Sequence, residues 1–251
     1  MIELENLGKR YGDFTAVDDL SLAVSPGEIF GFLGPNGAGK TTTIRMMMGL
    51  LRPTTGRIRL CGFDLADSPI EAKRVSGFVP DRPFLYEKLT GIELLRFCGD
   101  LYEVDPKTRE RRIVELLELF SLTDWGGELV EGFSHGMKQR LAFAAALLHD
   151  PKVLVVDEPM VGMDPRGARL LRSLLRSLAE KGTTLFLSTH SLEVAEALCD
   201  RIGIIQSARL VAVGTLEELR ARAGDARGLE EIFLKLTGAD DLLEVIQALR
   251  A

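Results

Sequence analysis

Apolar positions along the chain alternate between short, nearly continuous runs and longer stripes at helical spacing. Residues 29–33, 153–156 and 184–188 form runs of strand length, and leucines recur at helical spacing over residues 170–178. Continuous runs are typical of strands that are covered on both faces of a parallel sheet. Spaced stripes are typical of amphipathic helices. The alternation predicts an α/β fold whose parallel sheet is joined by crossover helices.

Residues 83–150 differ from the rest because helical periodicity replaces the strand pattern there. Residues 91–102 and 108–120 repeat apolar side chains on one face, and residues 138–148 are rich in Ala and Leu. The first thirty residues and residues 57–79 instead predict strands and turns. We therefore expect a mainly helical lobe inserted into an α/β core.

The domain organisation follows from these segments. A length of 251 residues suits one large domain with an inserted lobe. We expect this domain over residues 1–220, with the lobe at about 83–150. Residues 221–251 are charged and helical in pattern, and are expected to form a C-terminal helical tail.

Composition and charge narrow the class of protein. Apolar residues make up 46% and charged residues 27% of the chain, the balance of a globular protein. The net charge of -6 argues against nucleic acid as a partner, because phosphate backbones bind basic surfaces. No apolar run reaches the roughly 18 residues of a membrane span, and acids stand where a signal peptide would be basic. A membrane function would need another chain to supply the spanning part.

A glycine-rich segment follows the first apolar run. Residues 34–41 match the phosphate-loop pattern GxxxxGK[ST] and precede a predicted helix over residues 41–50. Glycines let backbone N–H groups turn inward around phosphate oxygens, and the helix adds the positive end of its dipole. Lys40 is expected to reach the β- and γ-phosphates, and the Thr41 hydroxyl to ligate Mg²⁺. The candidate nucleotide-binding residues here are Gly34, Pro35, Asn36, Gly37, Ala38, Gly39, Lys40, Thr41 and Thr42.

Two acids end the second apolar run. Asp157 and Glu158 directly follow residues 153–156. The carboxyl ends of parallel strands face the ligand crevice, so both carboxylates are expected there. Asp157 is expected to hold Mg²⁺ through water, and Glu158 to polarise the attacking water as a general base.

A third motif lies between these two. Residues 133–140 read Phe-Ser-His-Gly-Met-Lys-Gln-Arg. The segment resembles the signature LSGGQ followed by x-Q-R in the nucleotide-binding subunit of ATP-binding-cassette (ABC) transporters. Tyr11, Asp164 and His190 also stand where this family has motif residues, and the resemblance covers nearly the whole chain. It implies the ABC ATPase fold: a RecA-like P-loop NTPase core with a parallel sheet, an N-terminal antiparallel β region and an inserted helical subdomain.

The resemblance also implies a paired site. Two subunits of the family meet head to tail, as a homodimer or as paired ATPase subunits. Ser134 and the Gly136 N–H of one subunit would then contact the γ-phosphate of ATP held on the phosphate loop of the other. Asp164 would belong to the same set of ATP-binding residues.

The family pattern assigns further roles within the site. His190 would hydrogen-bond the γ-phosphate and help to orient the water, so that Glu158, His190 and Lys40 are the expected catalytic residues. Tyr11 would stack on adenine. ATP and Mg²⁺ are the expected substrate and metal.

Two departures from the family pattern stand out. Asp81 follows Val79-Pro80 where the family usually has Gln; its carboxylate can still meet Mg²⁺ or its water but cannot donate an amide hydrogen bond. Asp81 is therefore a candidate metal residue beside Thr41 and Asp157. His135 replaces a signature glycine, so either glycine matters little there or the backbone suits other residues.

These departures most resemble the ABC-2 branch, whose ATPases pair with separate membrane subunits and serve efflux. The resemblance implies a cytoplasmic subunit, peripheral on the inner face of the cell membrane, that drives export through an integral membrane permease. We expect the helical lobe, with Asp81 and residues 83–89, to dock that permease. The three cysteines are far apart and show no CxxC pairing, which agrees with a reducing compartment: Cys61, Cys98 and Cys199.

The alternative is an ABC-type ATPase without transport, regulatory or associated with DNA or ribosomes. DNA-maintenance relatives carry a long coiled coil between the two motif halves, and none fits here. Ribosome-acting relatives usually hold two cassettes in one chain, and this chain holds one. A regulatory ATP-binding protein without turnover is disfavoured by Glu158 and His190. A GTPase is excluded because its guanine-reading NKxD motif needs an Asn-Lys pair, whereas Asn6 and Asn36 precede Leu and Gly.

Overall fold

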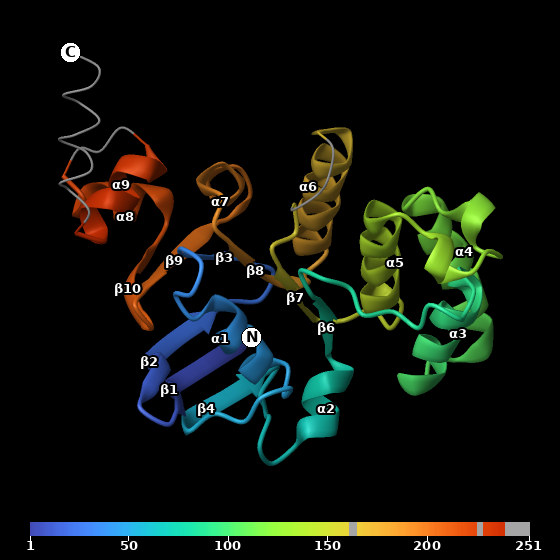
Figure 1. The fold of residues 1–251 in the computed structure, drawn as a ribbon, viewed down its shortest axis with the longest axis horizontal. Coiled ribbons are helices and arrows are strands. Elements are labelled where there is room, and N and C mark those ends of the chain that lie inside the picture. The colour runs from blue at the N-terminus through green and yellow to red at the C-terminus, as the bar shows by residue number, and fades with distance from the viewer. Residues whose placement is uncertain (161–164, 225–227, 239–251) are drawn as a thin grey trace.

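A six-stranded sheet runs through the computed structural model, which describes residues 1–160, 165–224 and 228–238 (Figure 1). Its strands, in spatial order, are β10 (Arg209–Gly214), β9 (Arg201–Gln206), β3 (Ile29–Leu33), β8 (Thr184–Thr189), β7 (Val153–Asp157) and β6 (Ser76–Val79). Every residue of β3, β7 and β8 is buried, as expected for continuous apolar runs. All neighbouring pairs except β10 and β9 are parallel. The predicted α/β fold with a parallel sheet is confirmed.

Strand β10 runs antiparallel to β9 at one edge of this sheet. Ser207 and Ala208 join the two strands, and both take left-handed backbone angles, with φ of 47° and 70°. A connection this short forms a hairpin, whereas a parallel neighbour needs a long crossover. The sheet is therefore parallel with an antiparallel edge strand.

The carboxyl ends of the parallel strands meet at one edge of the sheet. The phosphate loop follows β3, and Asp157 and Glu158 lie at the end of β7. His190 follows β8, and Asp81 lies just beyond β6. Segments that are far apart in the sequence thus come to the edge where parallel α/β sheets bind their ligands.

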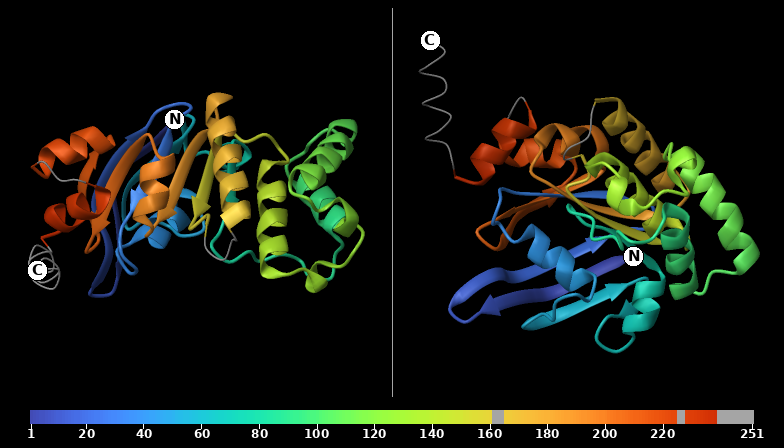
Figure 2. Two further views of the ribbon diagram at one scale, coloured as in Figure 1. Left: turned by 90° about the horizontal axis from the view of Figure 1, so that it is seen from above. Right: turned by 45° about the vertical axis from the view of Figure 1, so that its right-hand side comes forward.

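A second, antiparallel sheet packs against the central one (Figure 2). Its strands, in spatial order, are β2 (Phe14–Val24), β1 (Ile2–Tyr11), β4 (Thr55–Leu60) and β5 (Phe63–Asp64). Helix α1 (Lys40–Met47) follows the phosphate loop, and one apolar cluster joins it to both sheets through Leu20, Ile44 and Phe186. The predicted N-terminal antiparallel β region is confirmed.

Three principal helices form a lobe beyond β6 (Figures 1 and 2). They are α3 (Gly91–Leu101), α4 (Pro106–Leu119) and α5 (His135–Leu147), and short 3-10 helices lie at Thr123–Trp125 and Val130–Gly132. The Thr90 hydroxyl and the Asp105 carboxylate cap α3 and α4 by accepting backbone N–H bonds. Helix α5 begins before the predicted Lys138, because the Ser134 hydroxyl accepts the Met137 N–H at 3.3 Å. The predicted helical subdomain is confirmed.

A short helix, α2 (Pro69–Arg74), interrupts the region over residues 57–79 that the sequence predicts as strands. Proline stands in its first turn, where its fixed φ suits a helix and its missing N–H is not needed. Ala72 is buried, which ties α2 to the apolar cluster of both sheets. The rest of this region forms β4, β5 and β6 as expected.

The remaining helices lie together on the other face of the central sheet (Figure 1). They are α6 (Pro165–Glu180), α7 (Leu192–Leu198), α8 (Leu216–Arg222) and α9 (Leu229–Leu236). Leu171 and Leu175 of α6 are buried, as the leucine stripe predicts. Helix α6 packs against β8, and α9 packs against α7 and α8.

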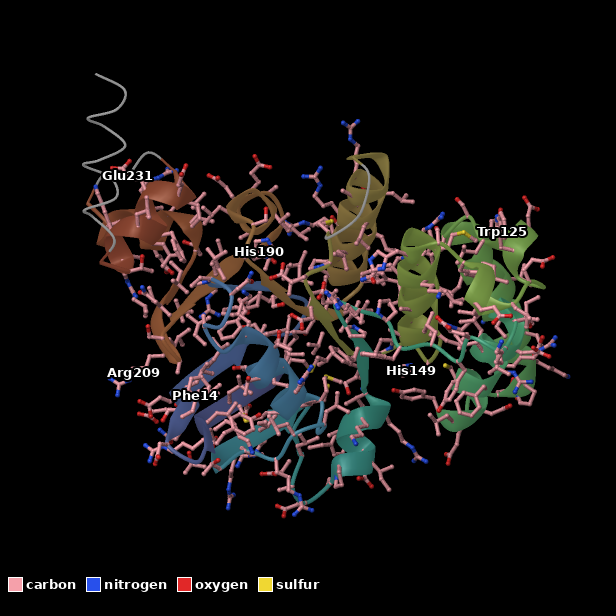
Figure 3. The ribbon with its side chains drawn as sticks, in the orientation of Figure 1. Phe14, Trp125, His149, His190, Arg209 and Glu231 are labelled. Atoms are coloured by element: carbon pink, nitrogen blue, oxygen red, sulfur yellow. The ribbon has the colours of Figure 1, made fainter. Side chains whose placement is uncertain are left out.

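His149 fills the seam between the helical lobe and the central sheet (Figure 3). Its ring stacks on Tyr102 next to α3, with ring centroids 3.7 Å apart. Its Nε2 lies 3.1 Å from the carbonyl oxygen of Ser76 on β6. Burial lowers the pKa of His149 to about 4, and the positive charge of Arg112 acts in the same direction. The imidazole is therefore neutral at neutral pH and donates a hydrogen bond to Ser76.

This lowered pKa predicts acid sensitivity of the fold. Between about pH 6.5 and 4 the unfolded histidine binds a proton that the folded one excludes. The contribution of His149 to the free energy of unfolding therefore decreases as the pH is lowered through this window, and it is constant above the window. The variant His149→Phe keeps a ring against Tyr102 but does not titrate. Its free energy of unfolding should fall less than that of the wild type, by about 2 kcal/mol, between about pH 7.5 and 5. Urea unfolding of both proteins measures the difference, and equal losses would contradict the assignment.

Candidate active site at the carboxyl edge of the sheet

The phosphate loop forms a backbone cradle between β3 and α1. Gly37 and Gly39 have φ of 83° and 113°, values that side chains rarely allow. A Cβ at Gly34 would lie 2.4 Å from the Ile205 carbonyl oxygen, and one at Gly39 would lie 2.5 Å from the Ala16 carbonyl oxygen. Gly39 is the N-cap of α1, and no side chain caps this helix. The first backbone N–H groups of α1 are therefore free to bind an anion.

Lys40 lies inside this cradle. Its side chain is only 6% exposed, and its Nζ donates to the carbonyl oxygens of Gly34 at 2.6 Å and Pro35 at 3.2 Å. The same Nζ lies 3.6 Å from Glu158 Oε1. The loop thus holds the ammonium group between the anion-binding amides and the end of β7.

Two oxygen donors converge beside the loop. Thr41 Oγ1 donates to Asp157 Oδ2 at 3.2 Å, and Ser188 Oγ donates to the other carboxylate oxygen. Asp157 is buried, and the hydrogen bonds from these hydroxyls replace the water that its carboxylate lacks. Hydroxyl and carboxylate oxygens are ligands that Mg²⁺ prefers, and Thr41 and Asp157 fit such an ion. Sequence reasoning missed Ser188, although a polar residue within a buried strand was the available signal.

Glu158 is held in an unusual backbone conformation. Its φ is 51°, which costs a non-glycine residue about 1 kcal/mol or more. Its N–H donates to the Ser188 carbonyl oxygen at 3.1 Å, which ties the end of β7 to β8. Its Oε1 lies 2.9 Å from His190 Nδ1, and its Oε2 accepts the His190 N–H at 3.4 Å. The structure brings together the predicted catalytic residues Lys40, Glu158 and His190.

The signature residues lie on the helical lobe. Ser134 caps α5, and Gly136 is open, since an added Cβ there would meet nothing within 4 Å. His135 is the first residue of α5 and does not have a positive φ, so its backbone suits a side chain. Ser134 and Gly136 line a groove of about 1030 Å³ with Arg140 and residues of α4 and α6, and this groove includes no residue of the phosphate loop.

The other predicted nucleotide residues lie at the margins. Tyr11 ends β1 with 49% of its side chain exposed, and the Lys9 ammonium lies 5.1 Å from its ring centroid. Phe14 faces it across the hairpin and is 64% exposed. Asp164 lies outside the described residues.

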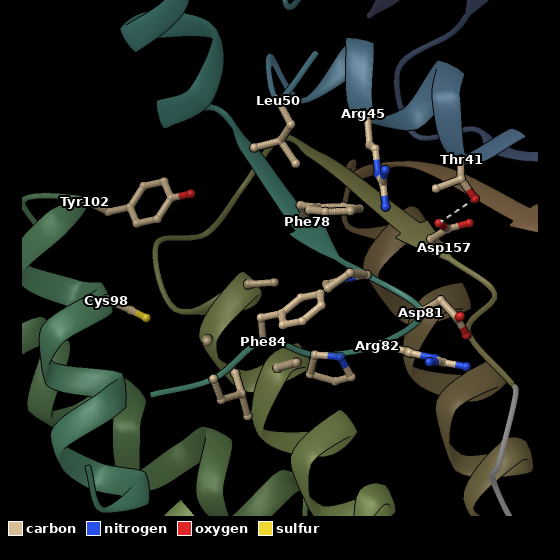
Figure 4. A pocket seen from close by; sticks show the side chains of 16 residues that line it. Thr41, Arg45, Leu50, Phe78, Asp81, Arg82, Phe84, Cys98, Tyr102 and Asp157 are labelled. Atoms are coloured by element: carbon tan, nitrogen blue, oxygen red, sulfur yellow. Dashed lines mark hydrogen bonds between the residues drawn. The ribbon is translucent and has the colours of Figure 1, made fainter. Parts of the chain in front are cut away.

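Asp81 lies in a cleft of about 580 Å³ between the central sheet and the lobe (Figure 4). Thr41 and Asp157 line the same cleft, together with apolar side chains that include Phe78 and Phe84. The structure therefore brings all three candidate metal residues to one cleft. It also joins the metal-compatible oxygens to an apolar surface on the lobe.

The fold places the phosphate loop, with Lys40 and Thr41, beside Asp157 at one edge of a parallel sheet, which is the arrangement of a P-loop NTPase. Comparison with known families narrows this class. The family model that matches residues 17–161 is described as ABC transporter. The chain therefore belongs to the ABC transporter family, as an ATP-binding subunit that hydrolyses ATP.

Two curated relatives illustrate the similarity. The linearmycin resistance ATP-binding protein LnrL of Bacillus subtilis (strain 168) is 39% identical over 241 residues, which cover 93% of this chain and 78% of LnrL. The daunorubicin resistance ATP-binding protein DrrA3 of Streptomyces coeruleorubidus is 42% identical over 226 residues, which cover 90% of this chain and 72% of DrrA3.

Solved structures agree with the family. A structure of the ATP-binding subunit of an ABC transporter matches with a TM-score of 0.90 and 35% identity, covering 94% of this chain and 99% of that one. The dimeric structure of the bacterial ABC transporter cassette MJ0796 matches with a TM-score of 0.79 and 26% identity, covering 86% of this chain and 99% of that one. Within the described part of this chain, no helix is long and apolar enough to cross a membrane.

The position of Asp81 generates a prediction. The variant Asp81→Gln should keep ATPase activity within about threefold of the wild type, because an amide oxygen can replace a carboxylate oxygen toward a metal-bound water. Steady-state phosphate release measures this. Asp157→Asn, which alters the buried carboxylate, is the matched comparison and should lose far more. A loss above about tenfold in Asp81→Gln would show that the carboxylate itself is required.

Proposed function

We propose that this chain is the ATPase subunit of an exporter, and that it drives an unidentified substrate through a separate membrane subunit. The observation that carries the catalytic part is the Glu158 carboxylate, which lies between Lys40 and His190 at 3.6 Å and 2.9 Å. The relatives named for resistance to linearmycin and daunorubicin support export.

The proposed chemistry assigns one task to each of these groups. The amides of the phosphate loop and Lys40 bind the β- and γ-phosphates of ATP. Glu158 takes a proton from the attacking water as the water oxygen bonds to the γ-phosphorus and the bond from that phosphorus to the β-phosphate oxygen breaks, which releases ADP and inorganic phosphate. His190 orients that water and contacts the γ-phosphate from the turn that follows β8. Thr41, Asp157 and Asp81 would hold Mg²⁺, which when bound neutralises charge on the phosphates.

The remaining ATP contacts come from a second subunit. The dimeric structure of the similar cassette MJ0796 supports pairing of two such chains. In the proposed pair, Ser134 and Gly136 of one chain face the phosphate loop of the other, and the dipole of α5 favours the γ-phosphate. Asp164 joins this contact, and Tyr11 stacks on adenine. Two-fold symmetry then gives two equivalent sites in a homodimer.

The proposed base and dimer lead to one test. The variant Glu158→Gln should still bind ATP, but steady turnover should fall at least about 100-fold because the amide cannot accept the proton. Without hydrolysis the nucleotide should hold the two chains together, so light scattering should detect a dimer at saturating ATP. The exposed acid variant Glu71→Gln on α2 is the control and should behave as the wild type. Unchanged hydrolysis would remove Glu158 from the mechanism, and a monomer would contradict the pairing.

The cleft beside Asp81 is the proposed docking site for the membrane subunit. It opens onto large apolar side chains in contact with water, and Phe84 is 92% exposed. Such a patch on a globular protein marks an interaction surface. Arg45 and Arg82 line the same cleft and would favour an acidic group on the partner. Leu50 and Phe84 are the exposed apolar side chains that line the cleft, and the exposed rings of Tyr86 and Phe97 contact each other at the start of the lobe.

With this docking site, the chain would lie peripherally on the cytoplasmic face of the membrane, which leads to another test. In cells of the source organism, Phe84→Asp should reduce the fraction of the chain that sediments with membranes by at least about tenfold, because a charge replaces an apolar anchor. Val114→Asp, on the exposed face of α4, is the matched control. Both purified variants should retain their ATPase activity. Equal sedimentation of the two variants would argue against this cleft, and a wild-type chain that does not sediment with membranes would favour an ATPase without transport.

A further inference from the structure

Helix α9 packs against α7, the helix that begins two residues after His190 (Figures 1 and 3). Leu229 and Ile232 on its inner face are 1% and 0% exposed. They share one apolar cluster with Ala195 of α7. The outer face of α9 carries an ion pair between Glu231 and Lys235 at 3.1 Å. Helix α9 is thus amphipathic, and its apolar face packs against α7.

The same apolar cluster extends to the segment before the phosphate loop and to the segment after His190. It contains Leu33, the last residue of β3 before the phosphate loop, and Leu192, the first residue of α7, packs against it. Close-packed apolar side chains transmit displacement because few voids can absorb it. Helix α9 is therefore packed, through this cluster, against the segment that precedes the phosphate loop and the segment that follows His190.

The turn that carries His190 depends on α7 for its position. The Ser191 N–H donates to Thr189 Oγ1 at 3.0 Å, and Ser191 Oγ caps α7 by accepting the Val194 N–H at 3.4 Å. The Thr189 carbonyl oxygen accepts the Gly34 N–H at 3.3 Å. The His190 side chain itself is 51% exposed, so burial does little to fix it. Its distance from Glu158 is set mainly by this backbone turn.

We infer that α9 is a positioning element of the reaction, and that Leu229 and Ile232 hold α7 so that His190 stays beside Glu158. The inference rests on the role proposed for His190 in hydrolysis. A displacement of about 1 Å at a reacting group can cost about 100-fold in rate, so a loosened α7 is enough to matter. Strand β3, which leads into the phosphate loop, is also paired with β8 and β9 on its two sides, so the loop and the ATP affinity that depends on it should change little.

The test uses the full chain with the variant Ile232→Ala. We expect kcat to fall about tenfold while the Kd for ATP changes by less than about twofold. The fall should largely disappear when His190→Ala is already present, because the two changes act on one step. Ile58→Ala opens a similar cavity in the apolar cluster of the two sheets and is the control. It should lower Tm but leave kcat unchanged.

Hydrogen exchange provides a readout that does not depend on turnover. Amides of residues 189–195 should exchange faster in Ile232→Ala than in the wild type and no faster in Ile58→Ala. If Ile232→Ala does not fold, Ile232→Val removes a single methyl group and takes its place with the same readouts. Unchanged exchange at residues 189–195 would overturn the inference, and so would the same fall in kcat with and without His190. If His190→Ala itself leaves kcat unchanged, the role proposed for His190 fails, while the exchange data still decide whether α9 holds the turn.

Discussion

The structure depends above all on three charged side chains that are buried together at one edge of the central sheet. Lys40, Asp157 and Glu158 are 6%, 3% and 13% exposed. Buried charges are tolerated only where partners replace the lost water. Asp157 accepts hydrogen bonds from the hydroxyls of Thr41 and Ser188, and Lys40 donates to carbonyl oxygens of its own loop. These contacts require β3, β7 and β8 to be neighbours with their carboxyl ends aligned.

Backbone geometry at this edge serves the same end. The phosphate loop approaches neighbouring carbonyl oxygens too closely for a side chain at Gly34 or Gly39. Glu158 keeps a left-handed backbone although it is not glycine, and its N–H is tied to Ser188 on the next strand. Strain of this kind persists only where the surroundings hold it, and it is common at functional sites. The effect is to direct the Glu158 carboxylate at Lys40 and His190.

The two sides of the catalytic edge lead to different parts of the molecule. On one side, the cleft at Asp81 runs from Thr41 and Asp157 to the exposed apolar surface of the lobe, where Phe84 lies. On the other, the His190 turn leads through α7 to α9. The proposed docking cleft and the C-terminal helices therefore both lie next to segments that carry residues of this site. This arrangement suits a subunit whose hydrolysis has to be coupled to a partner.

Features that are local in the chain could be predicted from the sequence alone. The phosphate loop, the buried strands and the acids Asp157 and Glu158 were all predicted, because their chemistry lies in short contiguous patterns. Contacts between residues that are far apart in the sequence became visible only in the folded chain. They are the hydrogen bond from the Ser188 hydroxyl to Asp157, the contact between Glu158 and His190, and the packing of α9 against α7. His135 shows the division most simply. The sequence left open whether position 135 needs a glycine. In the structure His135 is the first residue of α5 and does not have a positive φ, so a side chain fits there. Backbone angles of this kind follow from the surrounding fold, which the sequence motif does not specify.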